Sequence, residues 1–215
     1  MKRFLSALFV CLMNIVVSSA QDATYQSNTL TAFKSFMPAR VTLKNGKTLK
    51  VLQANIFLKN SSLLYKSGAK NLQANMDNIA AVDINGCHYI HVDSVLAQVI
   101  DTLGSSRLLC APMLDMEAFE AQMASHREFT RIDISSMVSV TMTEFESAKD
   151  NGYPITNHYY FLINDRLVKA SERSCLRMIP KDKRRLFKTM MESGTFDWNE
   201  PQSLMKILKL MVAEP

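Results

Sequence analysis

The chain has 215 residues, of which 47% are hydrophobic, and a formal net charge of +5 from 25 Lys and Arg against 20 Asp and Glu. Four Cys are too few for a disulfide-stapled scaffold, and the six Gly are too scattered for a glycine-rich phosphate loop. The charge excess is far from the single-sign field of a dedicated nucleic-acid binder, so we expect no nucleic-acid partner.

Residues 1–20, MKRFLSALFVCLMNIVVSSA, have the layout of a secretory signal peptide. A basic pair precedes an apolar stretch at 4–17, and small residues at 18–20 form the expected cleavage site. This stretch is shorter than the roughly 20 apolar residues that span a bilayer. We therefore expect cleavage after Ala20, a periplasmic or secreted mature protein, and no transmembrane segment after signal removal.

After an N-terminal lead-in at 21–38, the sequence predicts a run of short strands. Asn45-Gly46 and Asn85-Gly86 each separate two apolar runs, which is typical of hairpins with a type I′ turn. The segment 94–104 fits either a capped helix or a strand, with a slight preference for a strand. The other predicted strands are 39–43, 47–52, 62–66, 79–84, 87–92 and 107–114.

The second half of the chain alternates between elements and then becomes helical. The predicted elements are a short amphipathic helix at 115–123, a strand at 137–142, a polar turn-rich stretch at 144–157 and a hairpin at 158–171 that turns at Asn164-Asp165. Two helices follow, one beginning at Pro180 and one capped by Asn199, and we expect them to form an antiparallel pair over the sheet.

These elements predict an α+β protein, a mostly antiparallel β-meander or partly open barrel packed by C-terminal helices. The expected divisions are a signal peptide at 1–20, the lead-in at 21–38, a β-rich domain at 39–171 and a helical segment at 172–215.

PKDKRRLFK, residues 180–188, is the most charged short stretch. At about 100° per residue, a helix places its basic residues opposite its apolar ones, so we interpret them as a solvent face. An alternative is an anion-binding surface that Lys169, Arg173 and Arg177 extend. The basic face is Lys181, Arg184, Arg185 and Lys188, and the apolar face is Leu186, Phe187, Met190 and Met191.

Cys87, His91 and Asp93 form the candidate polar cluster for catalysis, because alternate residues of a strand share one face. They would serve an envelope hydrolase. Residues two apart lie nearly 7 Å from one another along a strand, so a tight metal site would need further ligands, and we expect no metal and no cofactor. The mature chain has three cysteines, Cys87, Cys110 and Cys175. An odd number permits at most one disulfide bridge, and the alternative is that they are buried free thiols.

The motifs VTLKNGKTLKV, NIAAVDINGCHYIHVDS and YYFLINDRLVKAS, followed by a basic helix and a terminal helix, resemble uncharacterised exported proteins of Bacteroidales. The resemblance implies an envelope location and no particular activity. Asp93-Ser94-Val95 and Asp101-Thr102-Leu103 are also similar to the Asp-Ser/Thr-aliphatic acceptor of that group's envelope O-glycosylation, which a buried strand would exclude.

The sequence therefore favours a non-enzymatic periplasmic or cell-envelope protein that binds another protein or an envelope glycan. Export, the lack of a catalytic motif, and sheet edges that accept a partner strand support this hypothesis. The alternatives are the hydrolase that uses the Cys/His/Asp cluster and the anion-binding surface on the basic helix.

Overall fold

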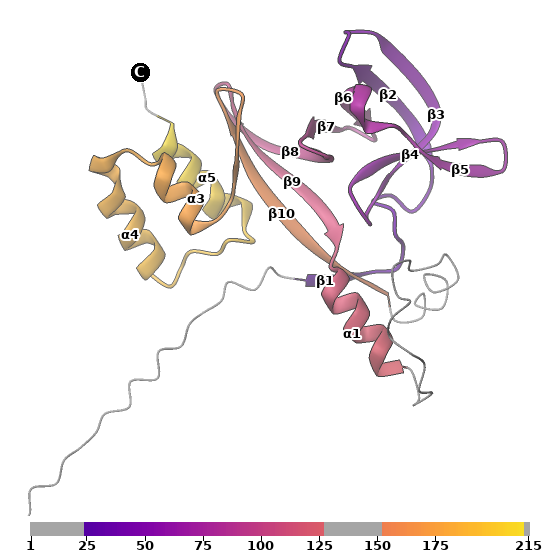
Figure 1. Cartoon of the computed structure of the whole chain (residues 1–215). Helices are drawn as coiled ribbons and strands as arrows, with labels where there is room; N and C mark the ends of the chain where they lie inside the picture. The colour runs from indigo at the N-terminus through magenta and orange to yellow at the C-terminus, as the bar shows by residue number, and fades with distance from the viewer. Residues whose placement is uncertain (1–23, 127–151, 213–215) are drawn as a thin grey trace, which may run out of the picture.

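A computed structural model describes residues 24–126 and 152–212. Its centre is one antiparallel sheet of 11 strands that curls on itself, with helices gathered near the C-terminus (Figure 1). The predicted α+β class and partly open barrel are thereby confirmed. The predicted signal peptide at 1–20, the predicted strand at 137–142 and most of the stretch predicted as polar and turn-rich at 144–157 lie outside the described residues.

The sheet order is β1-β10-β9-β8-β7-β6-β2-β3-β4-β5, and β11 also pairs with β10. Every pairing is antiparallel. The strands are β1 (Thr24–Ser27), β2 (Met37–Leu43), β3 (Thr48–Phe57), β4 (Ser62–Ser67), β5 (Lys70–Gln73), β6 (Ile79–Ile84), β7 (Cys87–Val92), β8 (Val95–Leu103), β9 (Ser106–Leu114), β10 (Tyr153–Ile163) and β11 (Arg166–Lys169).

The ambiguous segment 94–104 contains strand β8, which confirms the preferred alternative; it pairs with β7 on one side and β9 on the other. The expected polar turn at 153–157 is wrong, since this is the first, largely buried part of β10. Two further strands were not predicted. β1 in the lead-in pairs with β10, and β5 is exposed along its whole length, so neither has an alternating apolar pattern.

The Asn-Gly turns differ from one another. Asn85 and Gly86 both have positive φ, 52° and 75°, as a type I′ turn requires. At the β2–β3 turn only Gly46 is positive, at 81°, and Leu43 N–H donates to the Lys47 carbonyl at 2.8 Å. This hairpin therefore has a longer loop that ends in a glycine bulge, not the expected type I′ turn.

The helices are α1 (Met116–His126), α3 (Glu172–Met178), α4 (Arg184–Glu192) and α5 (Pro201–Met211), with 3-10 turns η1 (Met76–Asn78) and η4 (Lys181–Lys183). The helix expected from Pro180 begins with η4, and α4 follows. Glu200, not Asn199, is the N-cap of α5, because Pro201 takes the first helical position. The helix packed most closely on α5 is α3, which was not predicted separately.

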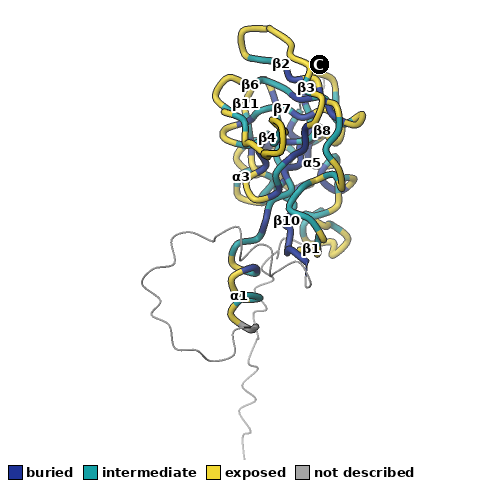
Figure 2. Tube along the Cα trace, turned by 90° about the vertical axis from the view of Figure 1, so that its right-hand side faces the viewer, coloured by how far each residue is buried: buried dark blue, intermediate teal, exposed yellow. Residues whose placement is uncertain are grey.

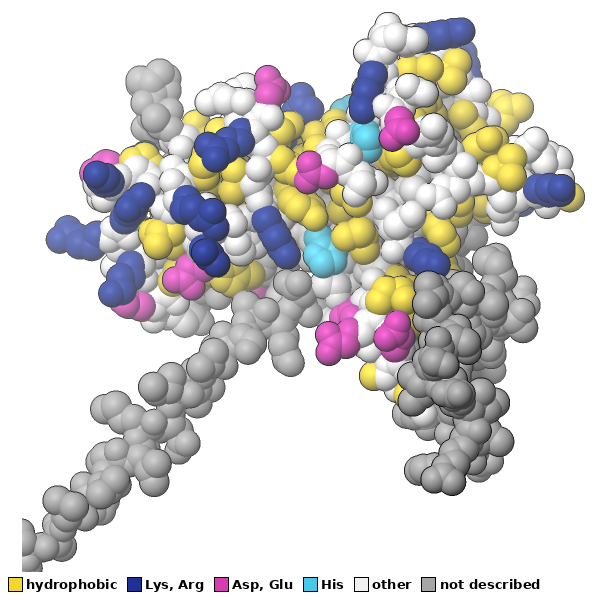
Figure 3. All heavy atoms as spheres, in the orientation of Figure 1, with side chains coloured by type: hydrophobic (Ala, Val, Ile, Leu, Met, Phe, Trp, Pro, Cys, Tyr) yellow, Lys and Arg dark blue, Asp and Glu magenta, His cyan; other side chains and the backbone are white. Residues whose placement is uncertain are grey.

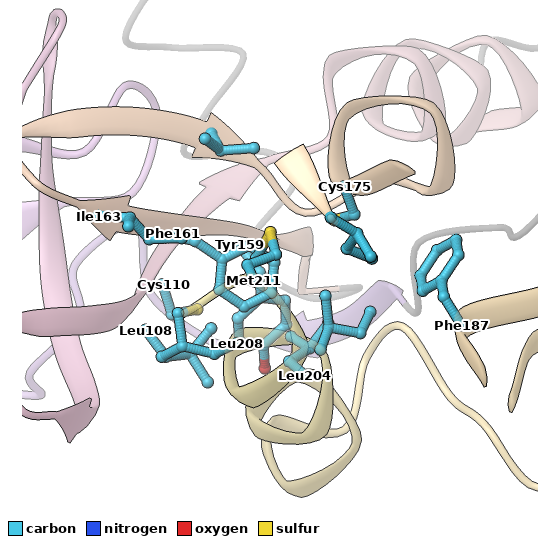
Figure 4. Close-up of a cluster of buried hydrophobic side chains, with 13 residues drawn as sticks. Leu108, Cys110, Tyr159, Phe161, Ile163, Cys175, Phe187, Leu204, Leu208 and Met211 are labelled. Atoms are coloured by element: carbon cyan, nitrogen blue, oxygen red, sulfur yellow. The ribbon is translucent and has the colours of Figure 1, made fainter. Parts of the chain in front are cut away.

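The largest core cluster lies between the helices and the strands β8–β10 (Figure 4). Phe187 from α4 and Leu204, Leu208 and Met211 from α5 face the side chains of β9 and β10 there (Figure 4). A second cluster is formed by β2, β3, β6 and β7, together with Leu63 and Leu96. A third occupies the face of β8–β10 that the helices leave free, around Ala97, Leu109 and Ala111.

Candidate functional site

A hollow of about 400 Å³ lies on the face of β9 and β10 that is turned away from α5. Successive residues of a strand point to opposite faces, so Tyr160 faces the hollow while its neighbours Tyr159 and Phe161 face the helical core. The lining residues are Lys59, Asn60, Val92, Asp93, Ser94, Val95, Met113, Tyr160 and Leu167.

The β7–β8 turn forms one rim of this hollow. Val92 pairs with Val95, so Asp93 and Ser94 alone connect the two strands. Asp93 has a φ of 52°, a left-handed conformation that Asp tolerates better than most residues. The turn therefore holds a carboxylate and a hydroxyl at the edge of an apolar floor.

The β3–β4 loop contributes Lys59 and Asn60 to the lining and is fixed by hydrogen bonds. The buried Ser61 hydroxyl donates to the Leu96 carbonyl at 2.6 Å, and Leu96 N–H donates to the Ser61 carbonyl at 2.7 Å. Beside it, the Ser62 hydroxyl donates to Asn60 Oδ1 at 2.7 Å. These bonds attach the loop to β8, so the hollow is preformed.

Tyr160 contributes an aromatic ring and a hydroxyl. Burial raises the pKa of this phenol, and the negative charge of Asp93 raises it further. The hydroxyl therefore stays protonated at neutral pH and is available as a hydrogen-bond donor beside a carboxylate acceptor.

The described residues of the lining include few groups of the kind that glycosidases and thiol hydrolases use. Among the described lining residues Asp93 is the single carboxylate, whereas most glycosidases use two. No Cys or His belongs to the lining in the part of the chain that the structure describes, so that part supplies no thiol nucleophile and no imidazole base there.

The three residues predicted for a hydrolase are not brought together. Cys87 and Asp93 stand at opposite ends of β7, about 20 Å apart at roughly 3.3 Å per residue. Of the three, only Asp93 lines the hollow. Within the described ranges, no group of three or more His, Cys, Asp or Glu is placed to hold a metal ion.

His91 lies with part of its ring buried in the sheet. Its Nε2 atom is buried and has no hydrogen-bond partner among the described residues. Burial lowers the pKa of His91, Lys44 lowers it further, and a hydrogen bond to the Ile79 backbone opposes this effect. The ring is therefore held neutral.

The three cysteines that the structure describes, Cys87, Cys110 and Cys175, are free. Burial raises the pKa of Cys110 to about 12 and that of Cys175 to about 11. Both are therefore thiols at neutral pH and form part of the core beneath the helices. Cys87 is half-buried at the start of β7.

The basic residues predicted on one helix face are all exposed: Lys181, Arg184, Arg185 and Lys188. Local contacts engage two of them, because Arg184 Nε donates to the Ile179 carbonyl at 3.3 Å and Lys188 Nζ lies 3.7 Å from Glu192 Oε1. Leu186 was expected in the core but is 59% exposed. It lies about 100° around α4 from Phe187, the buried residue of that helix.

Ser94 and Thr102, the two hydroxyls of the acceptor-like motifs, are both exposed. Ser94 lies in the β7–β8 turn and Thr102 near the end of β8. Burial in a strand, which would have excluded these motifs, therefore applies to neither.

The hollow itself was not predicted from the sequence. Its lining comes from five separate parts of the chain, from Lys59 to Leu167, and these meet only because β10 pairs with β9 and the sheet curls. The sequence feature that could have indicated the hollow is Tyr159-Tyr160. Two successive aromatic residues on a strand face opposite sides of the sheet, so one of them lies away from the helical core.

No family model, curated protein or solved structure matches this chain. Among residues 24–126 and 152–212, none of the helices has the length and apolar character needed to cross a bilayer.

Proposed function

We propose that this protein is an exported, non-enzymatic module of the cell envelope that binds a glycan in the hollow at the β7–β8 turn. The observation that carries this proposal is the lining: an aromatic residue and an apolar floor beside Lys59, Asn60, Asp93 and Ser94. Sugars offer hydroxyl groups for such polar groups and apolar C–H faces for an aromatic ring.

The size of the hollow favours a small ligand over a folded protein partner. Its 400 Å³ lies toward the lower end of the range of about 300–1,000 Å³ for small-molecule sites. A stable protein interface would bury roughly 1,200–2,000 Å² of surface in total, far more than this hollow offers.

The signal peptide predicted at 1–20 and the resemblance to exported Bacteroidales proteins support the envelope location. Sequencing the N-terminus of the chain recovered from an envelope fraction tests it. A new N-terminus at Gln21 is the expected result, and an intact Met1 in a cytoplasmic fraction would contradict it.

The binding proposal is tested by titrating the purified chain from Gln21 to Pro215 with cell-envelope glycan fragments, first on an array and then by calorimetry. Asp93→Asn removes the charge while keeping a residue type that tolerates positive φ. A hydrogen bond to a charged group contributes about 1.5–3 kcal/mol, so we expect this variant to lose about tenfold or more in affinity.

Asp165→Asn is the matched control, because Asp165 also has a positive φ, 58°, in an exposed hairpin turn that does not line the hollow. It should bind as the unmodified chain does. Tyr160→Phe, which keeps the ring and loses the hydroxyl, should weaken binding less than Asp93→Asn. Binding of no glycan at all, or equal losses for Asp93→Asn and Asp165→Asn, would overturn the proposal.

A further inference from the structure

Charge is distributed very unevenly along the chain. Between Ala23 and Met76 there are eight Lys or Arg and no Asp or Glu. Between Asp77 and Val168 the balance reverses, with five Lys or Arg against thirteen Asp or Glu. The strands β1 to β5 thus form a purely cationic part of an otherwise mixed molecule.

Six of these basic residues lie on β2–β5 or in the two hairpin turns that connect β2 to β3 and β4 to β5. We call this region the cationic end, defined by Arg40, Lys44, Lys47, Lys50, Lys66 and Lys70. All six are exposed. The two hairpins project from the body of the molecule, on the side away from α3–α5 (Figure 1).

The same region exposes large apolar side chains. Leu52 on β3 is 80% exposed, Leu49 on the same strand 39%, and Leu72 on β5 38%. The residues around the β2–β3 turn are exposed along that loop (Figure 2). Figure 3 shows Lys and Arg side chains next to hydrophobic ones at the end of the molecule that β2–β5 form.

The charges of the cationic end are not neutralised within the described residues. None of the six side chains takes part in an ion pair there; Asp83, the cross-strand neighbour of Arg40, instead pairs with His88 Nδ1 at 2.7 Å. Lys66 lies over the ring of Phe36, 5.0 Å from its centroid, which leaves its charge in place. The basic helix α4 differs, because Glu192 pairs with Lys188.

We infer that the cationic end is a docking surface for an anionic phospholipid bilayer. Clustered basic residues are attracted to the negative surface potential of such a membrane, and exposed leucines beside them enter its interfacial region.

The kind of basic residue favours a lipid surface over a specific anionic group. Five of the six are Lys, a compact hydrated charge on a flexible stem, which suits a diffuse field of headgroups. A site that recognises one phosphate or carboxylate would be expected to use the planar, bidentate fork of Arg. Lys stems also lie along apolar surface while the ammonium group stays in water.

The inference is tested with vesicles of phosphatidylcholine mixed with phosphatidylglycerol, and with vesicles of phosphatidylcholine alone. The chain from Gln21 to Pro215 keeps every described element and lacks the apolar N-terminal stretch, which would bind bilayers by itself. We expect it to sediment with the anionic vesicles only, and to be released as salt screens the attraction.

Lys47→Glu with Lys50→Glu should weaken this binding by at least about 25-fold, because each basic residue near the surface contributes about fivefold. The control is Arg184→Glu with Arg185→Glu, an equal charge reversal at exposed positions of α4. It should retain most of the binding. Circular dichroism of all variants checks that they fold.

Leu52→Trp gives a second readout, since the chain has one Trp, at position 198. The added indole should shift its fluorescence to shorter wavelength with anionic vesicles, while the unmodified chain stays unchanged. Several results would overturn the inference: no binding to anionic vesicles, equal binding to neutral vesicles, or a loss of binding in the α4 variant and not in the variant of Lys47 and Lys50. Binding to soluble heparin without binding to vesicles would assign the surface to a soluble polyanion.

Discussion

The two ends of the sheet bury their apolar residues in different ways. At β8–β10 the helices cover one face, and Leu108 and Phe161 are fully buried between the sheet and α5. At β2–β5 no described helix of more than one turn covers the sheet, and the core around Val41, Ile56 and Val82 is closed by strands and loops. Only the covered end therefore depends on the C-terminal helices.

The uncovered end therefore has apolar side chains that its core does not use. Leu52 and Leu72 are exposed, although β3 and β4 bury Ile56 and Leu63 nearby. Such exposure contributes nothing to folding, since the hydrophobic effect follows the area removed from water. This is the physical reason to connect these leucines with binding.

The largest difference between the two ends of the sheet is expected when a large side chain at each end is replaced by Ala. Phe161→Ala should lower the free energy of unfolding by about 3–5 kcal/mol, because it opens a cavity under the helices. Leu52→Ala should change it by less than about 0.5 kcal/mol, since the side chain is exposed. Urea unfolding measures the free energy of unfolding of both variants. Similar decreases for the two would contradict the difference between the two ends of the sheet.

A smaller effect is expected from Asn55→Ala at the uncovered end. Asn55 is buried, and its side chain accepts from Phe33 N–H at 3.1 Å and donates to the Phe33 and Ser35 carbonyls. Loss of these bonds should cost about 1–3 kcal/mol. The exposed Asn71 on β5 is the control. An equal effect of Asn71→Ala in urea unfolding would show that the Asn55 side chain does not hold the segment at 33–35 in place.

The smallest predicted effect is the pH dependence that His91 produces. Its pKa is lowered in the folded chain, so its imidazole binds a proton more readily in the unfolded chain. The contribution of His91 to the free energy of unfolding is therefore present above pH 6.5, the ordinary pKa of His. This contribution is lost as the pH falls from 6.5 toward the lower pKa of the folded chain. His91→Gln should flatten the pH profile of the unfolding free energy, and an unchanged profile would argue against this environment.

Local patterns were enough to predict most of the fold. Apolar runs between turn residues gave the six strands from 39 to 114, and Asn164-Asp165, both with positive φ, formed the expected hairpin turn. Strands without such a pattern escaped prediction, because β1 and β5 are ordered by pairing and not by a buried face.

The candidate sites depended on tertiary structure. Asp93 was identified, but for a cluster with Cys87 that the length of β7 separates. Its actual neighbour, Tyr160, lies far along the chain, and pairing across β8, β9 and β10 brings the two together. Leu186 was assigned to the core because a helical wheel cannot show how wide a face the neighbouring elements cover.

Whether the hollow binds the glycan is measured by backbone amide exchange of the chain, with and without its best-binding envelope glycan. Ligand in the hollow should slow exchange in the turn at 93–94 and in the loop at 59–60, and leave the turn at 164–165 unchanged. Protection confined to other segments, or no protection at saturating glycan, would contradict the assignment of the hollow as the binding site.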